Sequence, residues 1–282
     1  MKNIIKLKLT LKKLFPRFYK ILKIIFNKDR NNIKFSGWGL TTEQIPPCLG
    51  NDDLEVNKEF LVTKKKIKIL IENEKFKLAQ FLNEPHINNI KDILSQLNEL
   101  DYRHYIVHFS ALYAKNNATS KNIVECGVCD GLTIFFAMNI FKKNFHSFLY
   151  DSWQAMREND ITDEKENVGK YSYLDLNNTK KNLQEYKNNI SYMEGYIPEI
   201  FISEKNHPDD ISWLHIDLNA SKPTQETLNF FFLRLCSNGV VLFDDYGWDG
   251  YESTRKVADT FFKDKKGDFL HFPTGQAMFI KK

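Results

Sequence analysis

The 282-residue sequence has little arginine, few cysteines and no long hydrophobic run. Only six of its 40 basic residues are arginines, so the bidentate donors that read bases and phosphates are scarce. The formal net charge is +4, but residues 1–30 alone carry +9, which leaves −5 (+4 less +9) for residues 31–282. A mildly acidic main body lacks the basic face that neutralises a phosphate backbone, and we therefore exclude nucleic acid as a partner.

The four cysteines are too few for the disulfide framework of a secreted protein. Cys126 and Cys129 form a C-x-x-C pair, but no second C-x-x-C is present to complete a zinc site. We expect both to be small residues packed in the interior, and the chain to work in the reducing cytoplasm.

No stretch approaches the roughly 18 uninterrupted apolar residues of a transmembrane helix, and no signal-peptide cleavage site follows the N-terminus. Residues 1–30 instead form a basic amphipathic segment, in which Phe18, Ile21, Leu22 and Ile25 share one helical face. Such a helix suits either the anionic inner surface of the cytoplasmic membrane or a protein surface, and the sequence leaves both open.

The rest of the chain divides into a helical part and an alternating part. Residues 31–115 are expected to form a loop and a helical cap, because apolar residues recur at helical spacing. Residues 116–282 are expected to form an α/β domain, because short apolar runs alternate with segments long enough for crossover helices such as 133–141 and 225–235. The expected strands are Ile123–Val128, Phe148–Tyr150, Ile190–Met193, Trp213–Leu218, Val240–Phe243, Phe269–Phe272 and Ala277–Ile280.

These runs predict a Rossmann-like, doubly wound and mostly parallel sheet of seven strands. The turn between the last two strands is too short for a crossover, so the last strand should be antiparallel. This is the outline of the class I methyltransferase fold, here preceded by an N-terminal helical region. Residues 153–189 exceed an ordinary loop, and we expect a lid-like insertion there.

The first strand of the α/β part ends in the pattern E-x-G-x-x-x-G, formed by Glu125, Gly127 and Gly131. A dinucleotide site needs three closely spaced glycines so that the backbone can approach a diphosphate, and one is missing here. A carboxylate at this place suits a ligand that carries an amino group, as S-adenosylmethionine (SAM) does. Asp151 ends the second strand, where acids accept hydrogen bonds from ribose, and Gly195 after the third strand leaves room for adenine. A helix cap is the alternative role for Asp151.

Three aspartates follow the fourth and fifth strands, namely Asp217, Asp244 and Asp245. Ligands of doubly wound sheets bind at the carboxyl ends of strands, and carboxylates gathered there repel one another unless a cation lies between them. Oxygen ligands favour Mg²⁺ or another hard divalent cation. The alternative is that one aspartate caps a helix and another is only solvated.

Together these segments resemble the macrocin/mycinamicin-type sugar O-methyltransferases over about residues 100–282. The resemblance implies SAM as methyl donor, held by Glu125, Gly127, Gly131 and Asp151, to which we add the neighbouring Thr133, Ser152 and Gly195. It also implies a divalent cation on the three aspartates, with Asp217 placed to act as base. The segments that carry the resemblance are ECGVCDG, YDSW, HIDLNASKPTQETLNFF, GVVLFDDYGWDGYESTRKVADTFF and PTGQAMFIKK.

The expected reaction is methylation of a hydroxyl group on a sugar or a surface-glycan or natural-product precursor. His215 and Lys222 are alternative candidates for the catalytic base. A phosphorylated or phosphoramidate-type capsule precursor is the alternative acceptor. An NAD-type oxidoreductase and a non-catalytic membrane-associated scaffold are the alternatives of another class, and the sequence leaves a homo-oligomer open.

Overall fold

The computed structural model describes residues 55–142, 144–162 and 165–282. These residues lie in one compact unit that spans Ile45–Lys282. The amphipathic segment expected over residues 1–30 lies outside the described residues, as does the beginning of the expected helical cap. No helix in the described ranges is both long enough and apolar enough to cross a membrane.

Seven strands form one sheet in the order β3-β2-β1-β4-β5-β7-β6. The five strands β1 to β5 pair in parallel, while β7 runs antiparallel to both β5 and β6. The predicted fold, with its antiparallel last strand, is therefore confirmed. The strands are β1 (Asn122–Cys126), β2 (His146–Asp151), β3 (Ile190–Glu194), β4 (Ile211–Ile216), β5 (Leu235–Phe243), β6 (Gly267–His271) and β7 (Ala277–Lys281).

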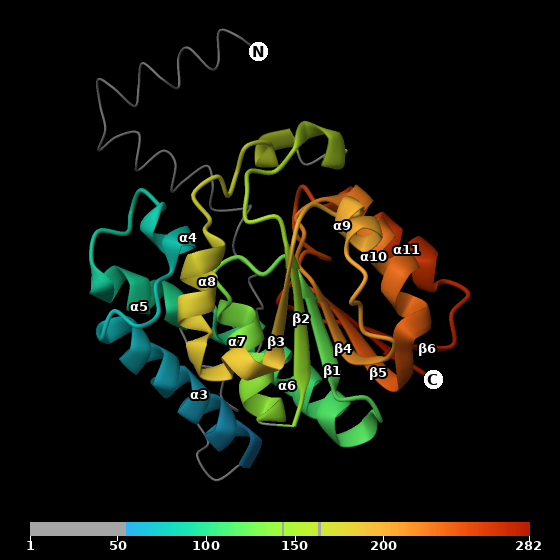
Figure 1. The fold of residues 1–282 in the computed structure, drawn as a ribbon, viewed down its shortest axis with the longest axis horizontal. Helices are drawn as coiled ribbons and strands as arrows, with labels where there is room; N and C mark the ends of the chain where they lie inside the picture. Colours follow the sequence, from blue (N-terminus) through green and yellow to red (C-terminus); the bar gives the residue numbers. More distant parts are fainter. Residues whose placement is uncertain (1–54, 143, 163–164) are drawn as a thin grey trace, which may run out of the picture. The chain divides into compact units, whose positions relative to one another are not determined.

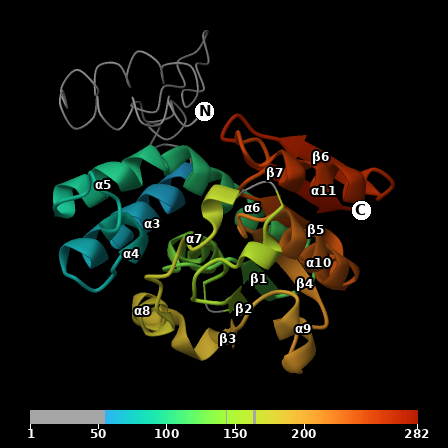
Figure 2. The same ribbon diagram turned by 90° about the horizontal axis from the view of Figure 1, so that it is seen from above.

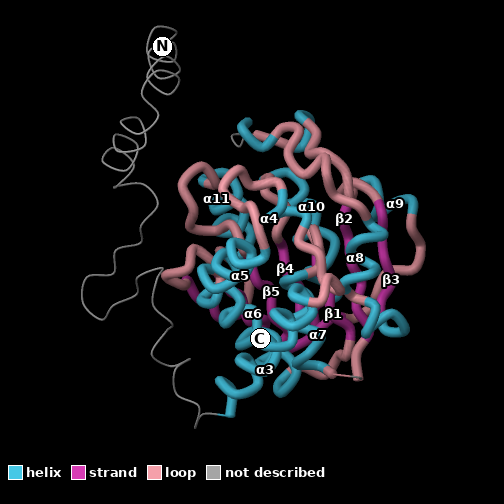
Figure 3. Tube along the Cα trace, turned by 90° about the vertical axis from the view of Figure 1, so that its left-hand side faces the viewer, coloured by secondary structure: helices cyan, strands magenta, loops and turns pink. Residues whose placement is uncertain are grey.

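Helices cover both faces of the sheet, as the cyan helices and magenta strands of Figure 3 show. On one face lie α3 to α8, and on the other lie α9 to α11 (Figures 1 and 2). Each face has its own cluster of buried apolar side chains. The helices are α3 (Glu55–Glu72), α4 (Ala79–Leu82), α5 (Ile90–Glu99), α6 (Asp101–Asn117), α7 (Leu132–Phe141), α8 (Leu176–Asn182), α9 (Glu199–Ser203), α10 (Ser221–Phe231) and α11 (Glu252–Phe262).

Helix α7 explains why the cap packs so closely on the sheet. Seven of its ten residues are buried, among them Ile134, Phe135 and Phe136. A helix that is apolar on all sides must be covered on all sides, and α3 and α6 both pack against it. The packing brings the cap helix α6 beside strands β4 and β5, whose ends carry the predicted aspartates.

Several boundaries differ from the sequence prediction, by two residues at both ends of β4 and by five at the start of β5. The helix expected over 225–235 begins earlier, at Ser221, and gives way to a 3₁₀ turn over Phe232–Arg234. Leu235 then opens β5, because its buried side chain pairs in register with Ile211. The insertion over residues 153–189 contains α8 and three short 3₁₀ helices, Glu158–Asp160, Lys165–Asn167 and Gln184–Asn189. Figure 1 shows part of it beyond the end of β2.

Candidate active site

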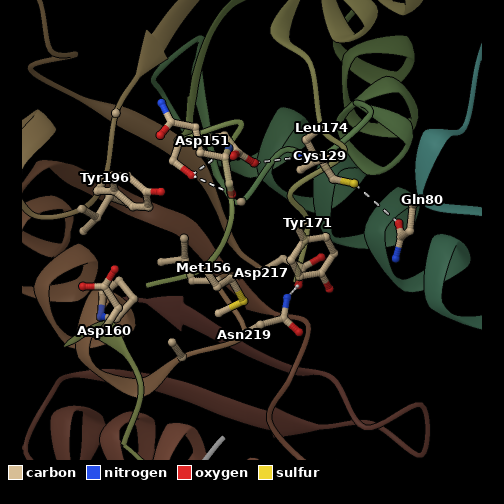
Figure 4. A pocket seen from close by; sticks show the side chains of 18 residues that line it. Gln80, Cys129, Asp151, Met156, Asp160, Tyr171, Leu174, Tyr196, Asp217 and Asn219 are labelled. Atoms are coloured by element: carbon tan, nitrogen blue, oxygen red, sulfur yellow. Dashed lines mark hydrogen bonds between the residues drawn. The ribbon is translucent and has the colours of Figure 1, made fainter. Parts of the chain in front are cut away.

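Two adjoining cavities lie at the carboxyl ends of β1, β2 and β4. The first cavity, drawn in Figure 4, is lined by Gly127, Asp151, Ser152, Gly195 and Tyr196, together with apolar side chains such as Met156. The second cavity is lined by side chains of the cap helices and of the loop after β5. The cavities share six residues, which are Gln80, Gly127, Cys129, Tyr171, Asp217 and Asn219.

Gly127 allows the ends of β1 and β4 to come together at this point. Its φ angle is +87°, and a Cβ placed on it would lie 1.8 Å from the carbonyl oxygen of Asp217. The Asp217 amide in turn donates to the Cys126 carbonyl over 2.9 Å. Only glycine fits this close approach, and the resulting turn brings Gly127 to the wall of both cavities. Gly131 has a φ of +83° and is the N-cap residue of α7, but it lines neither cavity.

Asp151 borders the first cavity and also organises the loop above it. Its carboxylate accepts backbone N–H bonds from Val128 (2.7 Å), Cys129 (2.9 Å) and Trp153 (2.7 Å). Burial raises its pKa, and the backbone donors oppose that shift. The carboxylate therefore fixes the loop after β1 whether or not a ligand is bound. Its contact with ribose stays a prediction.

Glu125 and His215 lie below the cavities and line neither of them. They face each other across the β1–β4 register, with 2.8 Å between Glu125 Oε1 and His215 Nδ1, and both side chains are fully buried. Burial raises the pKa of Glu125 and lowers that of His215 to about 3. The expected amino-group contact of Glu125 and the expected base role of His215 would both need a side chain at the cavity wall. The strand alternation turns both toward the core instead.

The three predicted metal ligands come together. The ligand atoms of Asp217, Asp244 and Asp245 all lie within 4.8 Å of one another. Strand β5 ends at Phe243, so the chain has already turned and both following carboxylates can face the same point. We call these three residues the carboxylate cluster. Burial, and next the charge of Asp245, raise the pKa of Asp217 to about 8.

The carboxylate cluster fits a hard divalent cation. Its donor set consists of carboxylate oxygens, which Mg²⁺ and similar cations prefer, and a cation between them would offset their mutual repulsion. The neighbours of the cluster include the Gln276 amide, which donates to Asp244 Oδ1 over 2.9 Å. The Asn219 amide donates to Asp217 Oδ1 over 3.2 Å, as the dashed line in Figure 4 marks.

Arg103 is a site residue that the sequence analysis missed. It projects from α6, forms an ion pair with Asp244 and lies 4.0 Å from Asp245. Its guanidinium also lies over the ring of Trp248, 5.2 Å from the centroid. No motif surrounds Arg103 in the cap, and only the packing of α6 beside β5 places it here. The sequence offered one indication of Arg103, namely that arginine is scarce in this chain.

The remaining predicted residues divide between the cavities and the surface. Ser152 and Gly195 line the first cavity, and Thr133 lines the second. Lys222 is exposed, lines neither cavity and donates from Nζ to the Asn159 carbonyl. It does not meet the geometric condition for the base, although the sequence made it a candidate.

We therefore expect Lys222→Ala to change kcat and KM for SAM by less than about twofold, because a general base must lie within hydrogen-bonding reach of its proton. Steady-state methyl transfer measures this. A loss of kcat above tenfold in both Lys222→Ala and Lys222→Arg would contradict the placement, because arginine keeps the charge but cannot act as a base.

Comparison with known proteins identifies one domain and supports the fold. Residues 124–246 match the family model for a methyltransferase domain, whereas no curated protein matches the sequence. The fold is similar to that of the O-methyltransferase NovP (TM-score 0.60, 13% identity, 81% of this chain and 100% of NovP). It is also similar to CalS11, a calicheamicin methyltransferase (TM-score 0.50, 14% identity, 78% of this chain and 91% of CalS11). The matched family model assigns residues 124–246 to a methyltransferase domain, and the sheet order with the likeness to NovP shows the Rossmann-like class I methyltransferase fold.

Proposed function

We propose that the protein transfers a methyl group from SAM to a hydroxyl oxygen of a sugar unit, with a divalent cation such as Mg²⁺ on the carboxylate cluster. The observation that carries this proposal is the position of Asp217. It borders both cavities and belongs to the carboxylate cluster. A methyl donor in the first cavity and an acceptor in the second would therefore meet beside it.

The first cavity suits SAM. Asp151, Asp160 and Asp217 supply negative charge for a ligand that carries an amino group and a sulfonium, while Leu174 and Ile197 supply apolar contacts. Gly195 follows β3 on the same wall, where the sequence predicts the adenine.

The second cavity suits a sugar more than a phosphorylated acceptor. Its wall combines the aromatic side chains of Tyr171, Trp248 and Tyr251 with the amides of Gln80 and Gln96. Aromatic faces and a few polar groups are what a sugar ring with its hydroxyls requires. Among the described residues of this wall, one arginine faces six carboxylates, and a phosphoryl group would meet mostly like charge. The six are Glu84, Asp130, Asp217, Asp244, Asp245 and Asp249.

Positioning does most of the chemical work in this proposal. SAM supplies an activated methyl group, so the protein has to hold an acceptor oxygen in line with it, an effect worth up to about 7–11 kcal/mol. A bound divalent cation would orient the acceptor hydroxyl and lower its pKa. Asp217 accepts the hydroxyl proton, because it is the carboxylate that lines both cavities and so lies between the donor and the acceptor. NovP, whose fold this chain shares, is itself an O-methyltransferase, which supports oxygen as the methylated atom.

Calorimetric titration of SAM tests the donor site, and methyl transfer to candidate sugars tests the acceptor and the cation. We expect Asp151→Ala to weaken SAM binding at least tenfold, because it releases the loop after β1. Asp244→Ala should keep SAM affinity within about threefold and lower kcat at least 100-fold, and EDTA should act on the wild type in the same way.

The exposed Asp249→Ala is the matched control, because it removes a carboxylate from the same cavity without touching the carboxylate cluster. Absence of SAM binding by the wild type would overturn the donor assignment. Full activity of both Asp244→Ala and the EDTA-treated wild type would overturn the cation.

A further inference from the structure

We propose that Arg103 and the divalent cation compete for Asp244, so that Arg103 stabilises the carboxylate cluster without the cation and releases Asp244 when the cation binds. This inference rests on the cation of the proposed function. It assigns a role to a residue of the cap, outside the matched methyltransferase domain.

Both oxygens of Asp244 already have partners. Oδ2 pairs with the Arg103 guanidinium. Oδ1 accepts a hydrogen bond from the Gln276 amide over 2.9 Å and lies 4.0 Å from His215 Nε2. Each oxygen keeps a second lone pair, so a neutral donor such as the Gln276 amide can share Asp244 with a cation, whereas the Arg103 guanidinium would face the cation as a like charge. Arg103 is the positively charged one of these donors, and repulsion from a dication makes it the one to leave.

The charge of Arg103 also explains how three carboxylates can lie together without a cation. The guanidinium pairs with Asp244 and lies 4.0 Å from Asp245, so its positive charge lies against two of the three carboxylates. One guanidinium balances one of three negative charges. A dication would balance two, and the exchange improves the charge balance of the carboxylate cluster.

The surroundings of Arg103 leave it room to move. Its side chain is 25% exposed, it lines the second cavity, and the Trp248 ring lies beside its guanidinium. A guanidinium can stay against an aromatic face while it changes its hydrogen-bonding partner. After release from Asp244 it remains in the cavity in which we place the acceptor.

Titration of Mn²⁺ followed by electron paramagnetic resonance tests the competition on the full chain without any acceptor. We expect Arg103→Gln to bind Mn²⁺ about tenfold more tightly than the wild type, while Arg103→Lys stays within about threefold because it keeps the charge. Without a cation, Arg103→Gln should have a lower melting temperature than the wild type. Saturating Mn²⁺ should raise the melting temperature of this variant by more than it raises that of the wild type. The exposed Arg255→Gln on α11 is the control for loss of one positive charge outside both cavities.

Unchanged or weaker Mn²⁺ binding by Arg103→Gln, while the wild type binds Mn²⁺, would overturn the competition alone. A tenfold gain in Arg255→Gln as well would also overturn it, because the effect would then come from net charge. Absence of Mn²⁺ binding in the wild type and in every variant would instead remove the cation from the proposed function. SAM titration of the same samples shows that each variant is folded.

Discussion

Replacing Gly127 with alanine is expected to destabilise the protein by about 2–5 kcal/mol and to abolish SAM binding. The left-handed backbone, with φ at +87°, costs a non-glycine residue about 1–2 kcal/mol. The added Cβ would also lie 1.8 Å from the Asp217 carbonyl oxygen, so the ends of β1 and β4 would have to separate. Because both ends form the wall of the first cavity, the damage reaches the donor site directly. Urea unfolding and calorimetric titration of SAM measure the two effects.

Gly250→Ala separates the two causes. Gly250 also has a positive φ, +92°, but nothing lies within 4 Å of the position of its Cβ. We expect this variant to lose only about 1–2 kcal/mol and to keep its affinity for SAM. Equal losses in the two variants would mean that the contact between the strand ends contributes nothing beyond the backbone angle.

Acidification from pH 7.5 to pH 5 is expected to cost about 2 kcal/mol of stability through His104 alone, at about 1.4 kcal/mol per pH unit below the unfolded pKa. His104 lies on α6, is 5% exposed and stacks on Phe136 with ring centroids 4.6 Å apart. Burial, and next the charge of Arg103, lower its pKa to about 3 from 6.5.

The sign of this dependence follows from the proton count. Below pH 6.5 the unfolded chain binds a proton at His104, whereas the folded protein does not until the pH approaches 3. Stability from this group is therefore complete above pH 6.5 and is lost as the pH falls toward 3.

Urea unfolding at intervals between pH 7.5 and pH 5 checks this expectation in the wild type and in His104→Phe. The variant should lose about 2 kcal/mol less over this range, whatever its stability at pH 7.5. His86→Gln replaces an exposed histidine and should keep the wild-type slope. A slope that is the same in all three proteins would assign the acid sensitivity to other groups.

The seven strands could be predicted from sequence because each depends on short-range features. The apolar runs have the length of buried strands, the turn before Gln276 is too short for a crossover, and the glycines stand where the backbone has to turn. The end of α10 was predicted less well. Whether Leu235 continues a helix or opens a strand depends on its pairing with Ile211, which is 24 residues away.

The carboxylate cluster shows how far the sequence alone determines the site. Strand order brings the carboxyl ends of β4 and β5 together, so the proximity of Asp217 to Asp244 and Asp245 follows from where the strands end. Which carboxylates reach the cavities, and which are buried below them, depends on the face of the strand and on what packs there. For this reason Glu125 was expected at the ligand and lies with His215 in the core.

The position of Arg103 beside the carboxylate cluster was decided by the tertiary structure alone. Arg103 and Asp244 are 141 positions apart, and nothing local marks Arg103 as part of a site. They meet because α7 is apolar on every side and draws α6 against β4 and β5. The sequence by itself determined the fold and the proximity of the three aspartates. The packing of the cap determined which positive charge faces them, since an ion pair between distant segments forms only when burial elsewhere brings those segments together.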